Sequence, residues 1–164
     1  MPGAIGYHAV KRALAAGLAA RAGLQGVVVS YAAPDKIPEI RGRNRSWENI
    51  HFDDAAGTVD NEVFCGAHLV YDADYIQTTK LQVLRPTSRG TQEACDERLE
   101  ELILELWAYL ADQSSWDLDA MGLATFDNLI VTPATFAFDT GLLAPAGHAA
   151  GVEIGLRVQT RRSP

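Results

Sequence analysis

The residues of this chain that could do chemistry are few and lie far apart. Cys65 and His68 are three positions apart, a spacing that could bring two metal ligands together. A tetrahedral zinc site needs further ligands, and no neighbouring pair repeats the pattern. The sequence also lacks a glycine-rich phosphate loop, a G-x-S-x-G elbow and an H-E-x-x-H pair. A buried cysteine and a strand-edge histidine therefore explain these two residues better than a metal site does.

Acidic residues and a second cysteine give the other candidates for chemistry. Asp53, Asp54 and Asp60 in one stretch, and Asp72 and Asp74 in another, could be read as cation ligands. Neither stretch has the glycine and distal glutamate of a calcium-binding loop, so turn formation explains them more simply. Cys95 could act as a nucleophile only beside a distant histidine, and it falls on the apolar stripe of a predicted helix, where a thiol is inert. The sequence predicts no catalytic residue, cofactor or metal, and indicates that the protein is not an enzyme.

Arginines mark two segments that could contact another protein. One is a polar stretch at 37–49, predicted to be an exposed loop, in which arginines alternate ahead of a tryptophan. The other is a short C-terminal tail at 161–164. Each is either plain solvated surface or a subunit contact, because Arg and Trp are enriched at interface hot spots. Nucleic-acid binding is a third reading of the stretch at 37–49, but three arginines are a weak footprint against the net negative charge. The candidate contact residues are Arg41, Arg43, Arg45, Trp47, Arg161 and Arg162.

Composition limits the class of protein. The 164 residues are 48% hydrophobic and 21% charged, which suits a single globular domain over 1–164. The formal charge of −7 argues against sequence-independent binding of duplex nucleic acid, which needs a basic surface. No apolar run approaches the roughly 20 residues that span a bilayer, so we expect no membrane association.

Periodicity predicts the elements that position these residues. A helix at 5–22 carries an apolar stripe, followed by a buried strand at 27–31 and a short strand at 49–52. A turn is expected at Asp53, Asp54 and Gly57. Strands at 62–71 and 75–85 follow, joined by a reversal at Asp72 to Asp74.

The second half of the chain gives the clearest pattern. A helix at 92–113, with Thr91 as its N-cap, has a continuous apolar face. A turn of helix at 118–121, a strand or a pair of strands at 126–138 interrupted by Pro133, and an alternating strand at 152–160 complete the chain. This order predicts an α+β fold, a mostly antiparallel sheet with two main helices packed on one face. The predicted face of the second helix consists of Cys95, Leu99, Leu102, Leu106 and Leu110, widened by Ile103 and Trp107.

Several stretches and their order resemble a family of phage proteins. Residues 48–53 read ENIHFD and residues 93–99 read EACDERL. The first is similar to the E-x-I-x-h-G-D stretch of the tail terminator (tail-completion) proteins of long-tailed, siphovirus-like bacteriophages, with Asp53 and Asp54 in place of Gly-Asp. The second resembles the helix that follows the central strand of that family. An alanine-rich first helix and an alternating last strand agree with the same order.

The resemblance implies a structural role in the virion, at the junction of head and tail, after assembly in the bacterial cytoplasm. Proteins of that family form sixfold rings that cap the tail tube, stop its polymerisation and dock onto the head connector. The implied partners are copies of the chain itself, the tail tube protein, the connector or stopper protein, and genomic DNA that passes through the lumen without specific binding. Acidic residues facing the lumen would help the DNA to slide. Alternatives are another neck or tail component, such as a connector adaptor or tube subunit, or a small ligand-binding α/β domain.

Overall fold

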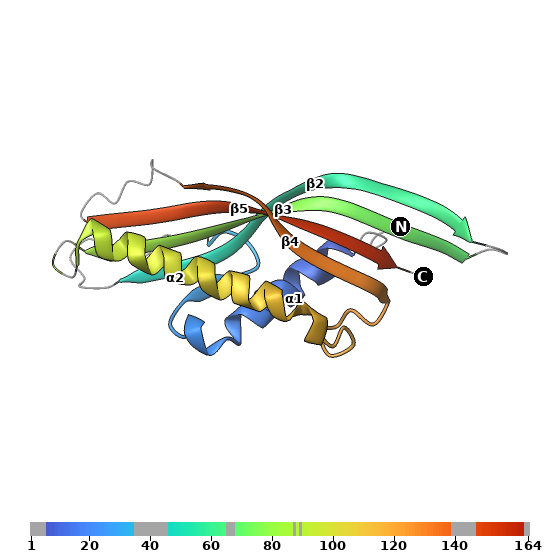
Figure 1. Cartoon of the computed structure of the whole chain (residues 1–164), viewed down its shortest axis with the longest axis horizontal. Coiled ribbons are helices and arrows are strands. Elements are labelled where there is room, and N and C mark those ends of the chain that lie inside the picture. The colour runs from blue at the N-terminus through green and yellow to red at the C-terminus, as the bar shows by residue number, and fades with distance from the viewer. Residues whose placement is uncertain are drawn as a thin grey trace.

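The computed structural model describes residues 6–34, 46–64, 68–86, 88, 90–138 and 147–162. Five strands form one sheet in the order β1-β2-β3-β5-β4, in which β1 runs parallel to β2 and all other neighbours are antiparallel. Both α-helices lie on one face of this long, twisted sheet (Figure 1), which confirms the predicted fold class. The elements are α1 (Tyr7–Ala19), η1 (Ala22–Leu24), β1 (Val28–Ser30), β2 (Trp47–Phe64), β3 (His68–Pro86), α2 (Gln92–Ala111), η3 (Asp112–Ser115), β4 (Phe126–Phe138) and β5 (Gly147–Arg162).

The hydrophobic core lies between the two helices and the sheet. The predicted stripe of α2 is buried, and the Thr91 side chain caps the helix by accepting a hydrogen bond from the Ala94 amide. Alternation along β3 and β5 places every second side chain in this core and the others on the helix-free face. The largest buried core side chains include Leu14, Leu18, Phe52, Leu81, Leu102, Leu106, Ile154 and Leu156.

Two predicted reversals are wrong, because β2 and β3 are long strands that pair from Trp47 opposite Leu84 to Phe64 opposite His68. Asp53 and Asp54 form a bulge, since the register shifts between Phe52 and Ala55. Turn preference is a property of Asp53 and Asp54 themselves, whereas a bulge depends on pairing with a distant strand, so the local sequence does not separate the two.

Core donors hold this bulge in place. The Asp53 carbonyl oxygen accepts hydrogen bonds from Gln77 Nε2 at 2.9 Å, and from the Tyr7 hydroxyl and Lys11 Nζ at 3.3 Å each. Gly57, also predicted to lie in a turn, sits inside β2, where a Cβ atom would collide with the backbone of β3. The glycine is therefore explained by a close strand approach and not by a reversal.

Asp72 and Asp74, the second predicted reversal, lie inside β3 and point to the helix-free face. Each meets an arginine across the strand pair: Asp72 faces Arg161, and Asp74 is next to Arg157. Cross-strand pairs of opposite charge favour the strand and offset the low strand propensity of aspartate.

The edges of the sheet differ from the predictions in detail. β1 is a three-residue edge strand, and Val28 is 47% exposed, so the prediction of a buried strand is wrong. β4 has its predicted bounds and tolerates Pro133 because its outer edge needs no donor. α2 ends at Ala111 and continues as the 3₁₀ turn η3. The predicted helical turn at 118–121 is present as a hydrogen bond from the Met121 amide to the Asp117 carbonyl.

Candidate assembly surfaces

The predicted contact residues differ in where they lie: some fall outside the described residues, one is in β2, and two are at the end of β5. Arg41, Arg43 and Arg45 lie outside the described residues. Trp47 is not in a loop but is the first residue of β2, half-buried opposite Leu84. The predicted loop at 37–49 therefore ends before residue 47.

The predicted C-terminal tail at 161–164 is also shorter, because β5 continues to Arg162. The Arg161 guanidinium donates to both carboxylate oxygens of Asp72 at 2.9 and 2.8 Å. The Arg162 guanidinium lies 5.3 Å from the centroid of the Phe126 ring, in a cation–π contact. Both arginines thus contact their own chain, since the alternation of β5 carries on to the end of the strand.

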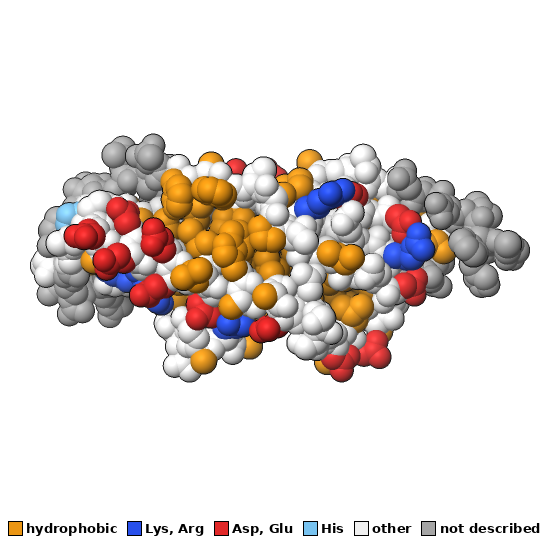
Figure 2. Space-filling view, in the orientation of Figure 1, with side chains coloured by type: hydrophobic (Ala, Val, Ile, Leu, Met, Phe, Trp, Pro, Cys, Tyr) orange, Lys and Arg blue, Asp and Glu red, His pale blue; other side chains and the backbone are white. Residues whose placement is uncertain are grey.

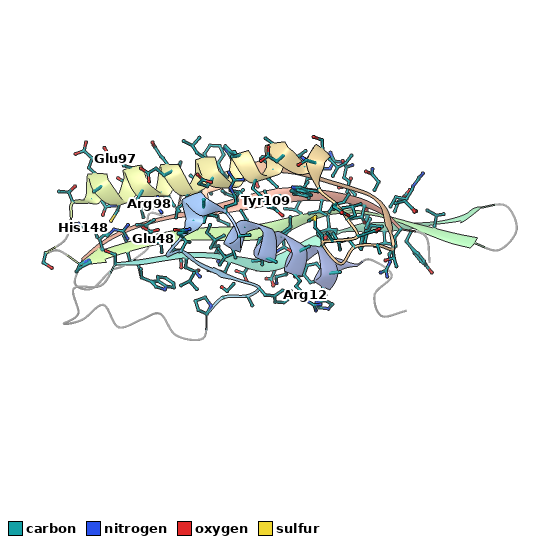
Figure 3. All side chains as sticks on the ribbon, turned by 90° about the horizontal axis from the view of Figure 1, so that it is seen from below. Arg12, Glu48, Glu97, Arg98, Tyr109 and His148 are labelled. Atoms are coloured by element: carbon teal, nitrogen blue, oxygen red, sulfur yellow. The ribbon has the colours of Figure 1, made fainter. Side chains whose placement is uncertain are left out.

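A partly buried ion cluster joins the two stretches that carry the resemblance. Glu48 of β2 accepts hydrogen bonds from Arg98 Nε and Nη2 of α2, both at 3.0 Å, and forms a further ion pair with Arg85 of β3. Figure 3 shows Glu48 and Arg98 close together between sheet and helix. Burial alone raises the pKa of Glu48, but the hydrogen bonds from Arg98 and Arg85 outweigh it and hold the pKa below its usual value. The cluster ties α2 to the sheet.

Sequence reasoning named both stretches but did not pair Glu48 with Arg98. The signal was present, because Glu48, Ile50 and Phe52 are two positions apart and so share one face of the strand, which is otherwise apolar. A charge on an apolar face needs an opposite charge nearby. Arg98 sits beside the apolar stripe of α2 and is the complementary residue.

The helix-free face of the sheet carries a ladder of ion pairs. Lys80 Nζ lies 3.2 Å from Asp53 and 3.7 Å from Glu153, and Arg157 pairs with Asp74 at 2.6 Å. The hydrogen bond from Arg157 lowers the pKa of Asp74. The hydrogen bond to Asp53 raises the pKa of Lys80. An open groove of about 510 Å³ lies at one end of this face, and its lining includes Asp72, Asp74, Asn128, Gln159 and Arg161. Among the described residues, no group of three or more His, Cys, Asp or Glu side chains is arranged to hold a metal ion.

Apolar side chains are exposed between α2 and the end of β4. On β4, Phe136 and Phe138 are 66% and 54% exposed, and their ring centroids are 5.7 Å apart. On α2, Leu104 is 64% exposed, and Ile103 and Trp107 are partly buried. We call these five residues the α2–β4 patch. Figure 2 shows apolar side chains gathered in this region. Contiguous apolar surface of this kind marks a site of protein contact.

The position of α2 explains why the α2–β4 patch is uncovered. Phe136 pairs with Ile154 and Phe138 pairs with Val152, so both rings project from the helix-covered face. However, α2 packs mainly on β3 and β5 and leaves the second half of β4 bare. The sequence predicted β4 as a strand, and Pro133 within it was a signal for an edge position that the sequence analysis did not use.

The two edges of the sheet are unlike each other. β4 forms one edge, and no described strand pairs with its outer side. At the other edge, β1 pairs with β2 only from Asn49 to His51, so within the described chain the rest of β2 has no outer neighbour. Free backbone groups at a sheet edge can pair with another chain. One molecule therefore presents two different surfaces for association.

Comparison with known proteins finds no family model that matches this chain and no curated protein that is similar to it. Within the described ranges, no helix is long and apolar enough to cross a membrane.

Proposed function

We propose that this chain is a structural protein of a bacteriophage tail, a tail terminator whose copies assemble head-to-tail into a ring. The observation that carries the proposal is the pair of unlike sheet edges, one of them bearing the α2–β4 patch. A contact between two different surfaces is heterologous, so each added copy leaves a free surface for the next. Such a contact gives a ring if its rotation closes, and a filament if it does not.

The resemblance of residues 48–53 and 93–99 to tail terminators supports a position for the ring at the head-proximal end of the tail tube. There, one side of the ring covers the last ring of tube protein and the other side docks onto the connector. This task requires shape and complementary surfaces and no reacting group. Genomic DNA passes through the opening without specific binding, which fits the formal charge of −7 on each chain.

The acidic residues that could ease the passage of DNA are not the aspartates of the two predicted turns. Asp72 and Asp74 are paired with arginines on the helix-free face. In a single chain, the exposed glutamates that form no ion pair with another described residue include Glu93, Glu97 and Glu100 on the solvent side of α2. The paired charges of the helix-free face would hold phosphates weakly if that face lines the opening.

The mass of the purified full-length chain in solution tests this proposal. Light scattering after size-exclusion chromatography should give a multiple of the 17.7 kDa chain, six copies for the ring implied by the resemblance. A chain that stays monomeric in concentrated solution would overturn the proposal. That result would favour a small ligand-binding domain, with the groove beside Asp72 and Asp74 as its first candidate site.

A further inference from the structure

The α2–β4 patch has an acidic rim, which specifies the chemistry of the surface that covers it. Glu93, Glu97 and Glu100 are exposed and lie four and three positions apart, with Leu104 four positions further, so all four follow one stripe of α2. Figure 2 shows acidic side chains grouped at one end of the apolar region, and Figure 3 shows Glu97 pointing away from the sheet. None of the three glutamates forms a hydrogen bond or ion pair with another described residue. The complementary surface must combine apolar and positively charged side chains.

One segment of this same chain has that composition. Residues 36–45 contain four cations and a single anion, Glu39, for a net charge of +3, together with two isoleucines. Many other cations of the described chain are engaged within it: Arg21 with Glu105, Lys80 with Asp53, and Arg157 with Asp74. The cations and apolar residues of the segment are Lys36, Ile37, Ile40, Arg41, Arg43 and Arg45.

The places where this basic segment joins the fold favour an intermolecular contact. It connects the end of β1 to the start of β2, at one edge of the sheet. The α2–β4 patch lies at the opposite edge, with β3 and β5 between them and α2 covering those two strands. A second copy that sits beside the first brings the β1–β2 edge of one copy next to the β4 edge of the other. The result is the repeating heterologous contact that a ring requires.

We infer that the α2–β4 patch and its acidic rim bind the basic segment at 36–45 of a second copy of this chain. The inference rests on the proposed self-assembly and names the surfaces that meet. The apolar residues supply buried area at the centre of the contact, and the glutamates and arginines at its border select the partner and its register.

Charge reversal on each side, followed by mixing, tests the contact in the full-length chain. The first variant carries Arg41→Glu, Arg43→Glu and Arg45→Glu, and the second carries Glu97→Arg and Glu100→Arg. Each alone should weaken self-association by about tenfold or more. An equimolar mixture of the two should form mixed assemblies, because the reversed surfaces are again complementary.

Three controls separate this contact from loss of folding and from charge alone. The triple Arg→Lys variant at 41, 43 and 45 should assemble as the wild type does. Asp119→Arg, on an exposed turn away from the patch, should also assemble normally. Circular dichroism melting curves should show that both charge-reversed variants remain folded.

The outcomes distinguish the two proposals. A wild-type chain that never self-associates would overturn the proposed function and, with it, this contact. A wild-type chain that assembles together with unimpaired charge-reversed variants would overturn the contact and leave the ring standing. Two impaired variants whose mixture also fails to assemble would likewise contradict direct pairing of the two surfaces.

Discussion

The two faces of β3 and β5 are built from alternate residues of the same strands, yet they contribute very differently to the stability of the fold. On the helix-covered face, side chains such as Leu81 and Ile154 are fully buried in the core beneath α2. On the other face, Asp74 and Arg157 pair in solvent. Burial of apolar area stabilises the fold strongly, whereas an exposed ion pair contributes little. The helix-free face can therefore vary without loss of the fold, and the helix-covered face cannot.

The largest effect is expected from a cavity on the helix-covered face. Leu102→Ala should lower the free energy of unfolding by about 2–5 kcal/mol, because Leu102 is fully buried between α2 and the sheet. Leu104→Ala is the matched control, two positions away on the same helix, and should change it by less than about 0.5 kcal/mol in the monomer. Chemical denaturation at low protein concentration measures both. Equal losses at the two positions would contradict the assigned face of α2.

An intermediate effect on the free energy of unfolding is expected at Glu48, a charged residue on the helix-covered face. Glu48→Gln should cost about 1–3 kcal/mol, because it removes the only carboxylate that pairs with both Arg85 and Arg98 in the described chain. The Glu48 side chain is only 14% exposed, so water replaces the lost contacts poorly. Glu101→Gln, which removes the exposed partner of Arg98, should cost much less. Equal costs for the two variants would show that burial adds nothing to this cluster.

The same cluster should make stability depend on pH. The pKa of Glu48 is lower in the folded chain than the ordinary value of 4.5, because the hydrogen bonds from Arg98 and Arg85 outweigh the effect of burial. Its stabilisation is therefore complete above the unfolded pKa and is lost as the pH falls through the folded pKa. The stability difference between wild type and Glu48→Gln should be constant near neutral pH and should shrink on acidification below about pH 4. A difference that grows in acid would give the opposite sign and reject the pairing.

The smallest effect is expected on the helix-free face. Asp74→Asn removes the partner of Arg157 but leaves both side chains in solvent, so thermal unfolding should shift little. What change there is should vanish in high salt, which screens exposed charges. A large loss of stability that salt does not alter would show that this face is covered by something in the folded chain.

Alternation and helical periodicity predicted the central elements because those elements have one buried and one exposed face. Thus α2, β4 and the core of β5 appear where the sequence places them. The errors at Asp53 and at Asp72 share a cause, since their partners, Gln77 and Arg161, are distant in the sequence. Turn preference is local, and those contacts are not.

The candidate surfaces were less predictable than the fold. The α2–β4 patch depends on the edge position of β4, which Pro133 alone hints at, and on which part of β4 the helix α2 covers, which no local pattern encodes. Arg161 looked like part of a free tail because nothing in the last four residues reveals Asp72 across the strand pair. The arginines at 41, 43 and 45 were named from composition, and their role stays a prediction.

Self-assembly through unlike edges is tested most directly by imaging the purified chain. Negative-stain class averages should show closed rings with one rotational symmetry, sixfold for the terminator role proposed above. Only twofold dimers, in which each copy uses the same surface, would contradict the heterologous contact. Images of single particles without any assembly would contradict it as well.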